Sequence, residues 1–519
     1  LLLIHTNGTA SQRKDAEATL SSGIRGKDDH LQFFPAAEPW CPYGAAFYLN
    51  ASPHIRNALY PITKFTNSWN DAVKDTYNHP ENGQLDGDYV DSYTGYMWKP
   101  DYGTNHHRTT SLPLTYTKDD FTLMSPLGFG TYEMCRSIGA DVHAMGRPFI
   151  ANGPFAWPRV PLGIELFDHG GNEDSWFDVS GQLVQPADSS LIYRRALSFQ
   201  RPYGFLMNTD FSLISHATME SYMRICAVYG IYPSAFSHNA AENNYFETPA
   251  LYERDRDLFK KYVPVIQAMN AAGWQPVTHA ASSTNAVALE RYGTNSLAGS
   301  MFLAVRNLSS SAQSPAITLD LARWAGAGLL LSATNLFDGG RQVLDLSRGE
   351  STLTPALQPD ECRVYRLNTL HPDTDGDGLP DAWEQVIMDA SPTDAVTGIA
   401  DVSGDTDFDR DGVPDGLEFI AGTDPCSSNG TFVLSIAASN NAIRIGFQAL
   451  TARGAHEDGF ARHYAVDRAT NFLPAAWYSL PGFTNLLANT NAIVQHVEIP
   501  TNHPAWFRAR AWLRALGNP

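Results

Sequence analysis

Three aspartates stand in the stretch LDGDYVDSYTGY, whose other residues are typical of a buried β-strand. A buried carboxylate is costly unless it is paired or used, so these residues are the first candidates for chemistry. Side chains alternate between the two faces of a strand, which separates Asp88 from Asp91. Asp86 precedes a glycine and is explained by a turn. We therefore predict that Asp91, at the strand end, is a functional carboxylate, with Asp88 as the alternative.

A second carboxylate comes from PLGIELFDHGGNED, in which we expect a strand over Pro161–Phe167 that carries Glu165. Further polar residues follow directly: Asp168, His169, Glu173 and Asp174. Glycoside hydrolysis needs two carboxyl groups from different elements, one as nucleophile or base and one as proton donor to the leaving oxygen. Asp91 and Glu165 are the predicted pair.

Polar and aromatic residues near these carboxylates suit a sugar site, because aromatic faces stack on sugar rings and polar groups hold hydroxyls. Tyr93 and Trp98 follow Asp91, and AWPRVP supplies further aromatic lining. Strand ends elsewhere carry Asn152, Asn208 and, just past a strand, His238. Adjacent histidines cannot both bind one ion comfortably, so His106-His107 is expected in a surface loop.

The elements that must position these residues alternate between short apolar runs and helical patterns from residue 1 to 275. This alternation predicts an α/β domain with a parallel sheet, a TIM-type (β/α)8 barrel whose strand ends build the site. The strand candidates are Leu1–Thr6, Ala45–Asn50, Leu85–Asp91, Arg147–Asn152, Pro161–Phe167, Tyr203–Asn208 and Ile231–Phe236. Seven strands are one short of a closed barrel, and we expect an incomplete N-terminus. An open doubly wound sheet is the alternative.

The rest of the chain predicts three further domains, as 519 residues exceed one core. Short strands parted by turn residues indicate an all-β sandwich over 276–369 and a second small β-sandwich over 428–519. Between them lies an acidic segment, 370–427, which is expected to bind metal.

Two twelve-residue stretches in that segment, DTDGDGLPDAWE and DFDRDGVPDGLE, match the spacing of a calcium loop. Oxygen ligands fall at positions 1, 3, 5, 7, 9 and 12, and glycine stands at the sharp turn in position 6. The sequence predicts about two structural Ca²⁺ sites and no cofactor for catalysis. Their ligands are Asp373, Asp375, Asp377, Leu379 (backbone), Asp381 and Glu384, and then Asp407, Asp409, Asp411, Val413 (backbone), Asp415 and Glu418.

The net charge of −19 is concentrated in the same segment, where residues 373–424 hold 13 Asp, 2 Glu and one Arg. The remaining chain is close to neutral, so nucleic acid is not an expected partner. No apolar run is long enough to span a membrane. The five scattered cysteines indicate neither a disulfide framework nor a zinc site.

The acidic segment, with GTDP after its second loop, resembles thrombospondin type 3 repeats of secreted bacterial proteins. That resemblance implies a calcium-stiffened spacer working outside the cell. The runs DGDYVDSY, PFIANGP, LGIELF and RPYGFLMN, followed by a β-sandwich, resemble retaining glycosidases of the α-galactosidase and endo-α-N-acetylgalactosaminidase groups. This second resemblance implies Asp91 as nucleophile and Glu165 as acid/base. It also implies that substrate hydroxyls are bound by Asn152, Asn208, Asp210 and His238.

Together these patterns predict a secreted or surface-attached glycosidase that acts on a polysaccharide or glycan, with Asp168 among its substrate-binding residues. The alternative is a non-catalytic carbohydrate-binding or surface-assembly protein on a decayed barrel. A polysaccharide lyase is disfavoured, because an acidic site repels acidic sugars.

Overall fold

A computed structural model gives the fold of the chain in two compact units, Leu1–Ile266 and Gln267–Pro519, which are described separately. The four predicted domains are finer than this division, and their borders stay predictions. The structure describes residues 9–38, 41–79, 85–95, 97–153, 161–236, 245–294, 299, 301–320, 328–345, 350–391, 396–439, 442–452, 454–471, 476–498 and 505–516.

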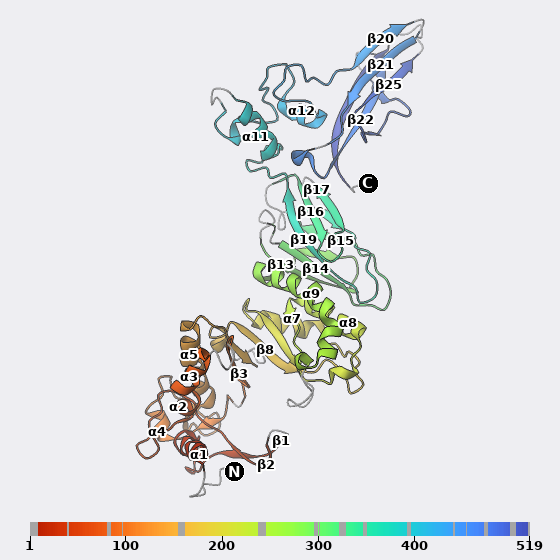
Figure 1. Ribbon diagram of the computed structural model, residues 1–519. Coiled ribbons are helices and arrows are strands. Elements are labelled where there is room, and N and C mark those ends of the chain that lie inside the picture. Colours follow the sequence, from red (N-terminus) through yellow and green to blue (C-terminus); the bar gives the residue numbers. More distant parts are fainter. Residues whose placement is uncertain are drawn as a thin grey trace. The chain divides into compact units, whose positions relative to one another are not determined.

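A five-stranded parallel sheet organises the first unit (Figure 1). Its order is β10-β9-β8-β7-β3, so each strand lies beside the next parallel strand of the chain. The bounds are Asp88–Val90 for β3, Phe149–Asn152 for β7, His169–Asp174 for β8, Tyr203–Met207 for β9 and Ile231–Tyr232 for β10. The predicted α/β class is thus confirmed. Over the described residues the sheet is open, and a closed barrel is not seen.

Long helices lie between and after these strands: α5 (Leu127–Ala144), α7 (Asp188–Leu197), α8 (His216–Tyr229) and α9 (Pro249–Ala272). The Ser215 hydroxyl caps the start of α8, and Gly230 ends it in the left-handed conformation at φ 60°. Buried side chains of α5 pack on Phe149 and Ala151. Since side chains alternate along β7, α5 covers the face opposite to Asn152.

Short elements precede α5: α1 (Ala10–Ser22), β1 (Phe33–Glu38), β2 (Cys41–Phe47), α2 (Lys64–Ser68), α3 (Asp71–Asp75), β4 (Pro100–Asp101), α4 (Thr104–His107), β5 (Thr115–Tyr116) and β6 (Leu123–Pro126). β1 and β2 pair antiparallel as a hairpin. The prediction of a parallel strand over Ala45–Asn50 was therefore wrong. The predicted strand over Leu1–Thr6 lies outside the described residues.

The segment Pro161–Phe167 is not a strand, contrary to prediction. It begins with the helical turn α6 (Pro161–Ile164), and the next strand, β8, comes later with the sequence HGGNED. A short apolar run does not by itself distinguish a buried strand from a helical turn. The shift moves Glu165 off the sheet and brings Glu173 and Asp174 to the end of β8.

The second unit begins with two antiparallel sheets, as the predicted sandwich over 276–369 requires (Figure 1). Their orders are β11-β13-β14-β19-β16-β17 and β12-β15-β18, around a core that includes Leu303, Ile317 and Leu367. The bounds are β11 Trp274–Gln275, β12 Ala280–Ser282, β13 Val287–Tyr292, β14 Met301–Asn307, β15 Ile317–Asp320, β16 Leu330–Asn335, β17 Arg341–Asp345, β18 Glu350–Leu353 and β19 Cys362–Leu370.

The acidic segment contributes two helices, α11 (Asp381–Ala390) and α12 (Asp415–Ala421), and a C-terminal sandwich follows. One sheet has the order β20-β21-β25, and in the other β22 pairs with β23, β24 and β26. The bounds are β20 Ser435–Ser439, β21 Ala442–Ala449, β22 Phe460–Ala469, β23 Tyr478–Ser479, β24 Leu486–Leu487, β25 Ala492–Glu498 and β26 Trp506–Ala515.

Arg462 of β22 joins the C-terminal sandwich to α12. Its side chain is 1% exposed and is ion-paired with Glu457. The guanidinium donates hydrogen bonds to the carbonyl oxygens of Phe419 and Ile420, at 3.1 and 2.8 Å. These carbonyls belong to the last turn of α12, where a cation is favourable. Gly422 ends the helix, and a side chain there would overlap Arg462.

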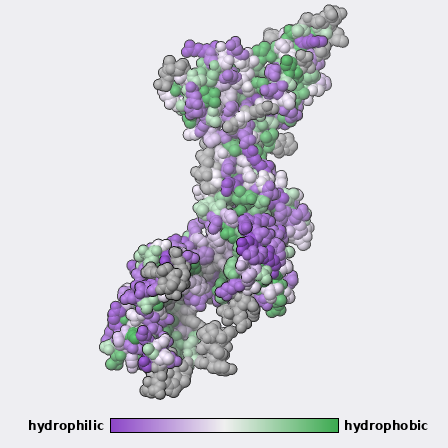
Figure 2. Space-filling view, viewed as in Figure 1, coloured by the Kyte–Doolittle hydropathy of each residue, from purple (hydrophilic) through white to green (hydrophobic). Residues whose placement is uncertain are grey.

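The described helices include none that is both long and apolar enough to cross a membrane. Figure 2 shows hydrophilic and hydrophobic residues interspersed over the visible face of the molecule.

Candidate functional site

Three polar residues meet at the carboxyl ends of neighbouring strands in the first unit. Asp91 follows β3, Asn152 ends β7, and Glu173 is the penultimate residue of β8. The Asn152 side-chain amide donates a 2.8 Å hydrogen bond to Asp91 Oδ1, and Asn152 Oδ1 accepts a 3.1 Å bond from the Glu173 backbone N–H. Asn152 therefore ties the strand end that carries Asp91 to the one that carries Glu173.

These residues share one face of the sheet, here called the inner face. Tyr89 lies opposite Ile150 in the register, and two residues further along β7 Asn152 lies opposite Gly171 of β8. Asp91 and Glu173 follow Tyr89 and Gly171 by two residues, so alternation returns both to the inner face. Burial, followed by the charges of Asp91 and Glu173, raises the pKa of Tyr89. Both carboxylates thus lie near the Tyr89 hydroxyl.

A cavity of about 180 Å³ opens on the sheet next to these groups. A side chain at Gly171 would overlap the backbone of Gly204, and one at Gly204 would approach His169 Nε2 to 3.1 Å. Burial lowers the pKa of His169 to about 4, so its imidazole is neutral at neutral pH. The cavity is lined by Tyr89, Ile150, Ala151, Asn152, His169, Gly171, Asn172, Gly204, Phe205, Leu206 and Ser234.

Asp88 lies on the opposite face of β3, toward the helices. Its Oδ1 accepts a 2.8 Å hydrogen bond from the Tyr89 backbone N–H. Burial, and then the charge and hydrogen bond of Asp88, raise the pKa of Tyr77 to about 12. The carboxylate also acts on the Cys135 thiol of α5, whose pKa is raised mainly by burial. Between the two predicted nucleophiles, only Asp91 lies on the inner face.

Glu165 lies just after α6 and faces α5 instead of ending a strand. Its Oε1 accepts a 3.2 Å hydrogen bond from the Tyr132 hydroxyl. Tyr93 is 1% exposed and packs edge-on against Phe167 with ring centroids 4.9 Å apart, so it is a core residue. Trp98 is 57% exposed. Glu165, Tyr93 and Trp98 line a pocket of about 300 Å³ with Met97, Leu112, Pro113, Pro126, Gly128, Phe129, Tyr132 and Gly163.

Two other predicted substrate ligands are occupied by structural contacts. Asp168 Oδ2 accepts a 2.8 Å hydrogen bond from the backbone N–H of Phe149, the first residue of β7, and lies 2.7 Å from His143 Nε2. Asp168 is thus at the amino end of the strands, away from Asp91. Asp210 accepts hydrogen bonds from the backbone and hydroxyl of Ser212 as the cap of a short 3₁₀ turn.

Asn208 follows β9 and lies at the same carboxyl edge as Glu173. Its backbone N–H donates a 3.1 Å hydrogen bond to the Asp174 carbonyl oxygen. The side-chain oxygen is buried and has no hydrogen-bond partner among the described residues. An unpaired buried acceptor is costly, so Asn208 fits a site that receives a donor from a ligand. The predicted ligand His238 and most of AWPRVP lie outside the described residues.

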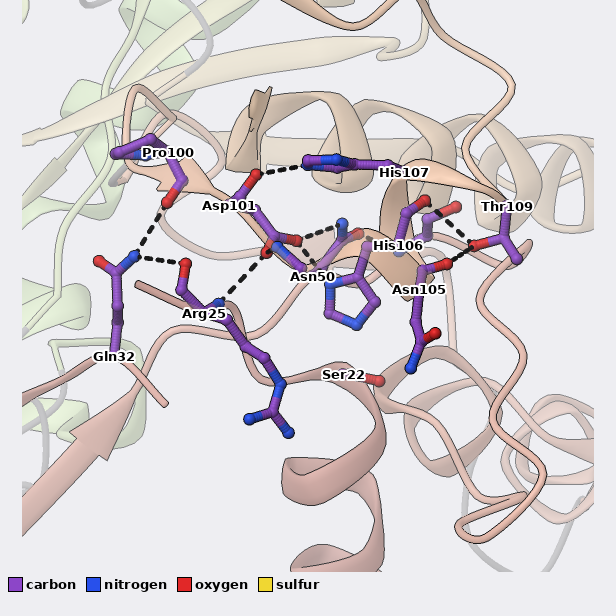
Figure 3. A network of polar contacts seen from close by, with 12 residues as sticks. Ser22, Arg25, Gln32, Asn50, Pro100, Asp101, Asn105, His106, His107 and Thr109 are labelled. Atoms are coloured by element: carbon purple, nitrogen blue, oxygen red, sulfur yellow. Dashed lines mark hydrogen bonds and ion pairs between the residues drawn. The ribbon is translucent and has the colours of Figure 1, made fainter. Parts of the chain in front are cut away.

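The prediction of a surface loop was wrong for His106, which is 5% exposed in α4 (Figure 3). His106 Nδ1 lies 2.5 Å from Asp101 Oδ2, and Nε2 lies 3.0 Å from the Ser21 carbonyl oxygen. Asn50 donates to the same carboxylate oxygen. Because both ring nitrogens face acceptors, His106 is held as an imidazolium ion. Burial opposes this charge, yet the bonds to Asp101 raise the pKa of His106 above its usual value.

The two acidic loops of the second unit each gather three carboxylates. Ligand atoms of Asp373, Asp375 and Asp377 lie within 4.8 Å of one another, as do those of Asp407, Asp409 and Asp411. The turn glycine at position 6 of each loop has the predicted left-handed backbone, with φ 97° at Gly378 and 94° at Gly412. At position 7 of each loop, the backbone N–H donates a hydrogen bond to the aspartate at position 5: Leu379 to Asp377 and Val413 to Asp411.

The position-12 glutamates show that these loops fit a cation. Glu384 and Glu418 are each 0% exposed, and no described residue pairs with either Glu384 oxygen or with Glu418 Oε2. Burial, followed by nearby aspartate charges, raises the pKa of Glu384 to about 8 and of Glu418 to about 7. A buried carboxylate beside three others is costly without a cation. Hard oxygen donors in this number suit Ca²⁺.

The predicted position-9 ligands, Asp381 and Asp415, are engaged within their loops. Both oxygens of Asp381 accept 2.7 Å hydrogen bonds from Thr374. Asp415 accepts from the Thr406 hydroxyl at 2.6 Å and from the Phe408 backbone at 3.1 Å. These two aspartates therefore hold the shape of each loop, and position 9 of such loops often reaches its ion through water.

Comparison with solved structures finds glycoside hydrolases. The maltogenic alpha-amylase AmyB from Thermotoga neapolitana is 11% identical with a TM-score of 0.28, and the match covers 46% of this chain and 59% of that one. A glycoside hydrolase family 97 enzyme from Pseudoalteromonas sp. strain K8, in complex with panose, is 13% identical with a TM-score of 0.30, and the match covers 58% of this chain and 49% of that one. A putative alpha-N-acetylgalactosaminidase from Bacillus halodurans C-125 is 11% identical with a TM-score of 0.25, and the match covers 58% of this chain and 92% of that one.

The chain thus spans about half the length of the first two enzymes. At these TM-scores the likeness does not establish a shared fold. No curated protein matches the chain. The bacterial TSP3 repeat model matches residues 373–385 and 407–427, which confirms the resemblance of the acidic segment to thrombospondin type 3 repeats.

Proposed function

We propose that the first unit is a glycoside hydrolase whose site lies on the inner face, with Asp91 and Glu173 as its two carboxylates. The observation that carries this proposal is the Asn152 side chain, which binds Asp91 and the backbone of Glu173 at once. Two carboxylates from different strands at the carboxyl edge of a parallel sheet are what glycoside hydrolysis requires. The exposed Glu173 takes the place that the sequence had given to Glu165.

The roles follow from the geometry. Asn152 holds the Asp91 carboxylate in place for attack on the anomeric carbon. Glu173 donates a proton to the leaving oxygen as that bond breaks, and then removes a proton from the water that releases Asp91 from the sugar. The Tyr89 hydroxyl and the unpaired oxygen of Asn208 are placed to bind sugar hydroxyls. Such a retaining reaction needs no cofactor.

A panel of amide variants tests the assignment on nitrophenyl glycosides and on polysaccharides. Asp91→Asn and Glu173→Gln are expected to lower kcat by at least ~10²-fold each. Asp88→Asn and Glu165→Gln are the matched controls and should keep activity within a few-fold. For an active substrate, the anomer formed first, read by NMR, reports retention or inversion.

Each other outcome has a definite meaning. Loss of turnover in Glu165→Gln with a normal Glu173→Gln would return the acid/base role to Glu165. A parent protein that binds glycans without cleaving them would instead support the non-catalytic, carbohydrate-binding alternative. Full activity of Asp91→Asn would overturn the proposal.

We further propose that the acidic loops hold two Ca²⁺ ions and that the protein acts outside the cell, secreted or attached to its surface. The match to bacterial TSP3 repeats and the unpaired buried glutamates support the calcium sites. Extracellular calcium is abundant enough to fill weak loop sites. The proposed substrate is a polysaccharide or glycan.

A further inference from the structure

The last strand of the chain, β26, divides its side chains between two faces. One set, including Phe507, Ala509 and Ala511, packs against the core of the C-terminal sandwich. Alternation sends the other set to the outer face of the sheet. That set, here called the arginine face, consists of Trp506, Arg508, Arg510, Trp512 and Arg514. Beside it, β22 presents the small residues Ala461, Ala465 and Ala469, together with His463 and Asp467.

Asp467 fixes two of these arginines in one arrangement. The carboxylate is 2% exposed, and its Oδ2 accepts hydrogen bonds from Arg508 Nε at 2.9 Å and from Arg510 Nε at 2.7 Å. Its Oδ1 accepts from Arg510 Nη2 at 3.0 Å and from the Ser479 hydroxyl at 2.7 Å. These bonds outweigh burial and lower the pKa of Asp467 to about 2. One buried negative charge thus orients two positive side chains.

The guanidinium groups keep donors for a ligand. Both arginine side chains are 46% exposed. Asp467 occupies Arg508 Nε and both Nε and Nη2 of Arg510, and Arg510 Nη2 also donates to Ser479 Oγ, so the donors that the described residues leave for a ligand are the two terminal nitrogens of Arg508 and Nη1 of Arg510. Indole rings flank them: the Arg508 guanidinium lies 4.6 Å from the Trp477 ring centroid, and that of Arg510 lies 5.8 Å from Trp512. Stacking on an aromatic ring limits the motion of a guanidinium and leaves its edge free to bind an anion.

The charge of this region contrasts with the rest of the chain. Residues 428–519 contain seven arginines, no lysine and four carboxylates, in a chain whose net charge is −19. Two of the four carboxylates, Glu457 and Asp467, are buried in contact with arginine. The arginine face is therefore a local cationic surface with aromatic rings on one side of the sheet.

We infer that the arginine face binds an anionic polysaccharide, whose carboxylate or sulfate groups are held by Arg508 and Arg510 while sugar rings stack on tryptophan. A guanidinium edge binds such oxyanions through two parallel hydrogen bonds. A DNA duplex is the denser polyanion, with phosphate charges in place of sugar carboxylates or sulfates, and the binding test therefore includes one. The inference does not depend on the proposed glycosidase activity.

Binding of the full chain, with calcium present, to dextran sulfate, carboxymethyl-dextran and uncharged dextran tests the inference. The two charged polymers distinguish sulfate from carboxylate as the bound group, and uncharged dextran should bind at least 10-fold more weakly than the better of them. Arg508→Lys with Arg510→Lys keeps a cation beside Asp467 but loses the bidentate edge, and should weaken binding at least 5-fold. Arg514→Gln, which leaves Asp467 paired, should weaken it 2- to 3-fold.

Arg444→Gln is the matched control, because Arg444 is an exposed arginine of β21 in the other sheet. It should bind within twofold of the parent, and circular dichroism and Tm should show all variants folded. Equal binding of charged and uncharged dextran would overturn the inference. So would unchanged binding by both arginine-face variants. Tighter binding of a DNA duplex than of dextran sulfate would replace the glycan with nucleic acid.

Discussion

The Asp101–His106 ion pair gives the first unit a stability that depends on pH. The pKa of His106 is raised, so its contribution is complete below its unfolded value and is lost as pH rises through the folded value. The pKa of Asp101 is lowered, so its contribution is present above its unfolded value and is lost as pH falls through the folded value. The pair therefore stabilises most between about pH 4 and 6.5, the two unfolded values.

His106→Gln is expected to lower the free energy of unfolding of the first unit by about 3–5 kcal/mol, because it leaves Asp101 buried without its cation. The loss should shrink as pH rises above 6.5 and through the raised folded pKa of His106, because the parent histidine then loses its proton. Urea unfolding at pH 5, 6, 7 and 8 measures this trend. His107→Gln is the control, since His107 bonds only a backbone oxygen of Asp101. A pH-independent difference would contradict the assignment of a charged His106.

A close contact between Gly163 and Tyr93 allows a second test. A side chain at Gly163 would overlap the hydroxyl of Tyr93, a side chain that is 1% exposed and packed edge-on against Phe167. Gly163→Ala should therefore lower stability by about 1–3 kcal/mol. Tyr93→Phe removes the oxygen, and the double variant should recover most of the loss. Additive losses in this double-mutant cycle, measured by urea unfolding, would show that the hydroxyl is not the obstacle.

Among single residues, a simple rule predicted that Asp91 and Asn152 lie at one edge of the sheet, where the structure joins them by a hydrogen bond; their roles in a site stay predictions. Each closes an apolar run, and parallel strands bring such ends to one edge. The sequence favours Glu165 over Glu173, because PLGIELF has the apolar composition of a strand and HGGNED does not. His106 could not be recognised, since its partners Asp101 and Ser21 become neighbours only after folding.

At the scale of elements, the misplacement of β8 has a physical cause. HGGNED contains none of the β-branched or aromatic residues that favour strands, and it forms one because β7 and β9 pair with it on both sides. Gly171, which carries no side chain, lines the inner cavity. The preceding PLGIELF has the apolar composition of a strand but packs as a helical turn. Tertiary context decided both cases.

Arg462 links β22 to the last turn of α12 in the second unit. Arg462→Met should lower the free energy of unfolding of this unit by about 3–5 kcal/mol, since it removes the cation that is ion-paired with the buried Glu457. Arg462→Met with Glu457→Gln should recover part of the loss. Calorimetry of the full chain measures both. No change in the second unit's Tm would contradict the cap described here.

For the whole molecule, calcium removal should act on one unit alone. With EGTA, four carboxylates in each loop repel one another, so the Tm of the second unit should fall while that of the first stays unchanged. Calcium at 100 times its Kd stabilises the folded state by about 2.7 kcal/mol per site. Calorimetry with and without EGTA checks this. Magnesium at the same concentration is the control, and equal protection by both ions would contradict calcium-specific loops.

The overall plan was predictable to the degree that it rests on local patterns. Strands and turn residues predicted the antiparallel sheets found in both regions, and fixed spacing predicted the repeats that the bacterial TSP3 model matches. The predicted closed barrel is not seen over the described residues, because closure depends on pairing between distant strands that no local pattern records. β10, for example, has only two residues, Ile231–Tyr232.

The hydrogen bonds from Arg462 to α12 also limit where the chain can be cut into fragments that fold. The predicted border at residues 427/428 falls between α12 and the sandwich that caps it, so a fragment ending there would expose the last carbonyls of the helix and an uncovered apolar surface around Phe419. The C-terminal sandwich also packs on the preceding one, since Phe460 and Ala515 share an apolar cluster with Leu330 and Val343. A fragment that is to carry both the calcium requirement and the arginine face to an unrelated catalytic domain should therefore span the whole second unit, Gln267–Pro519.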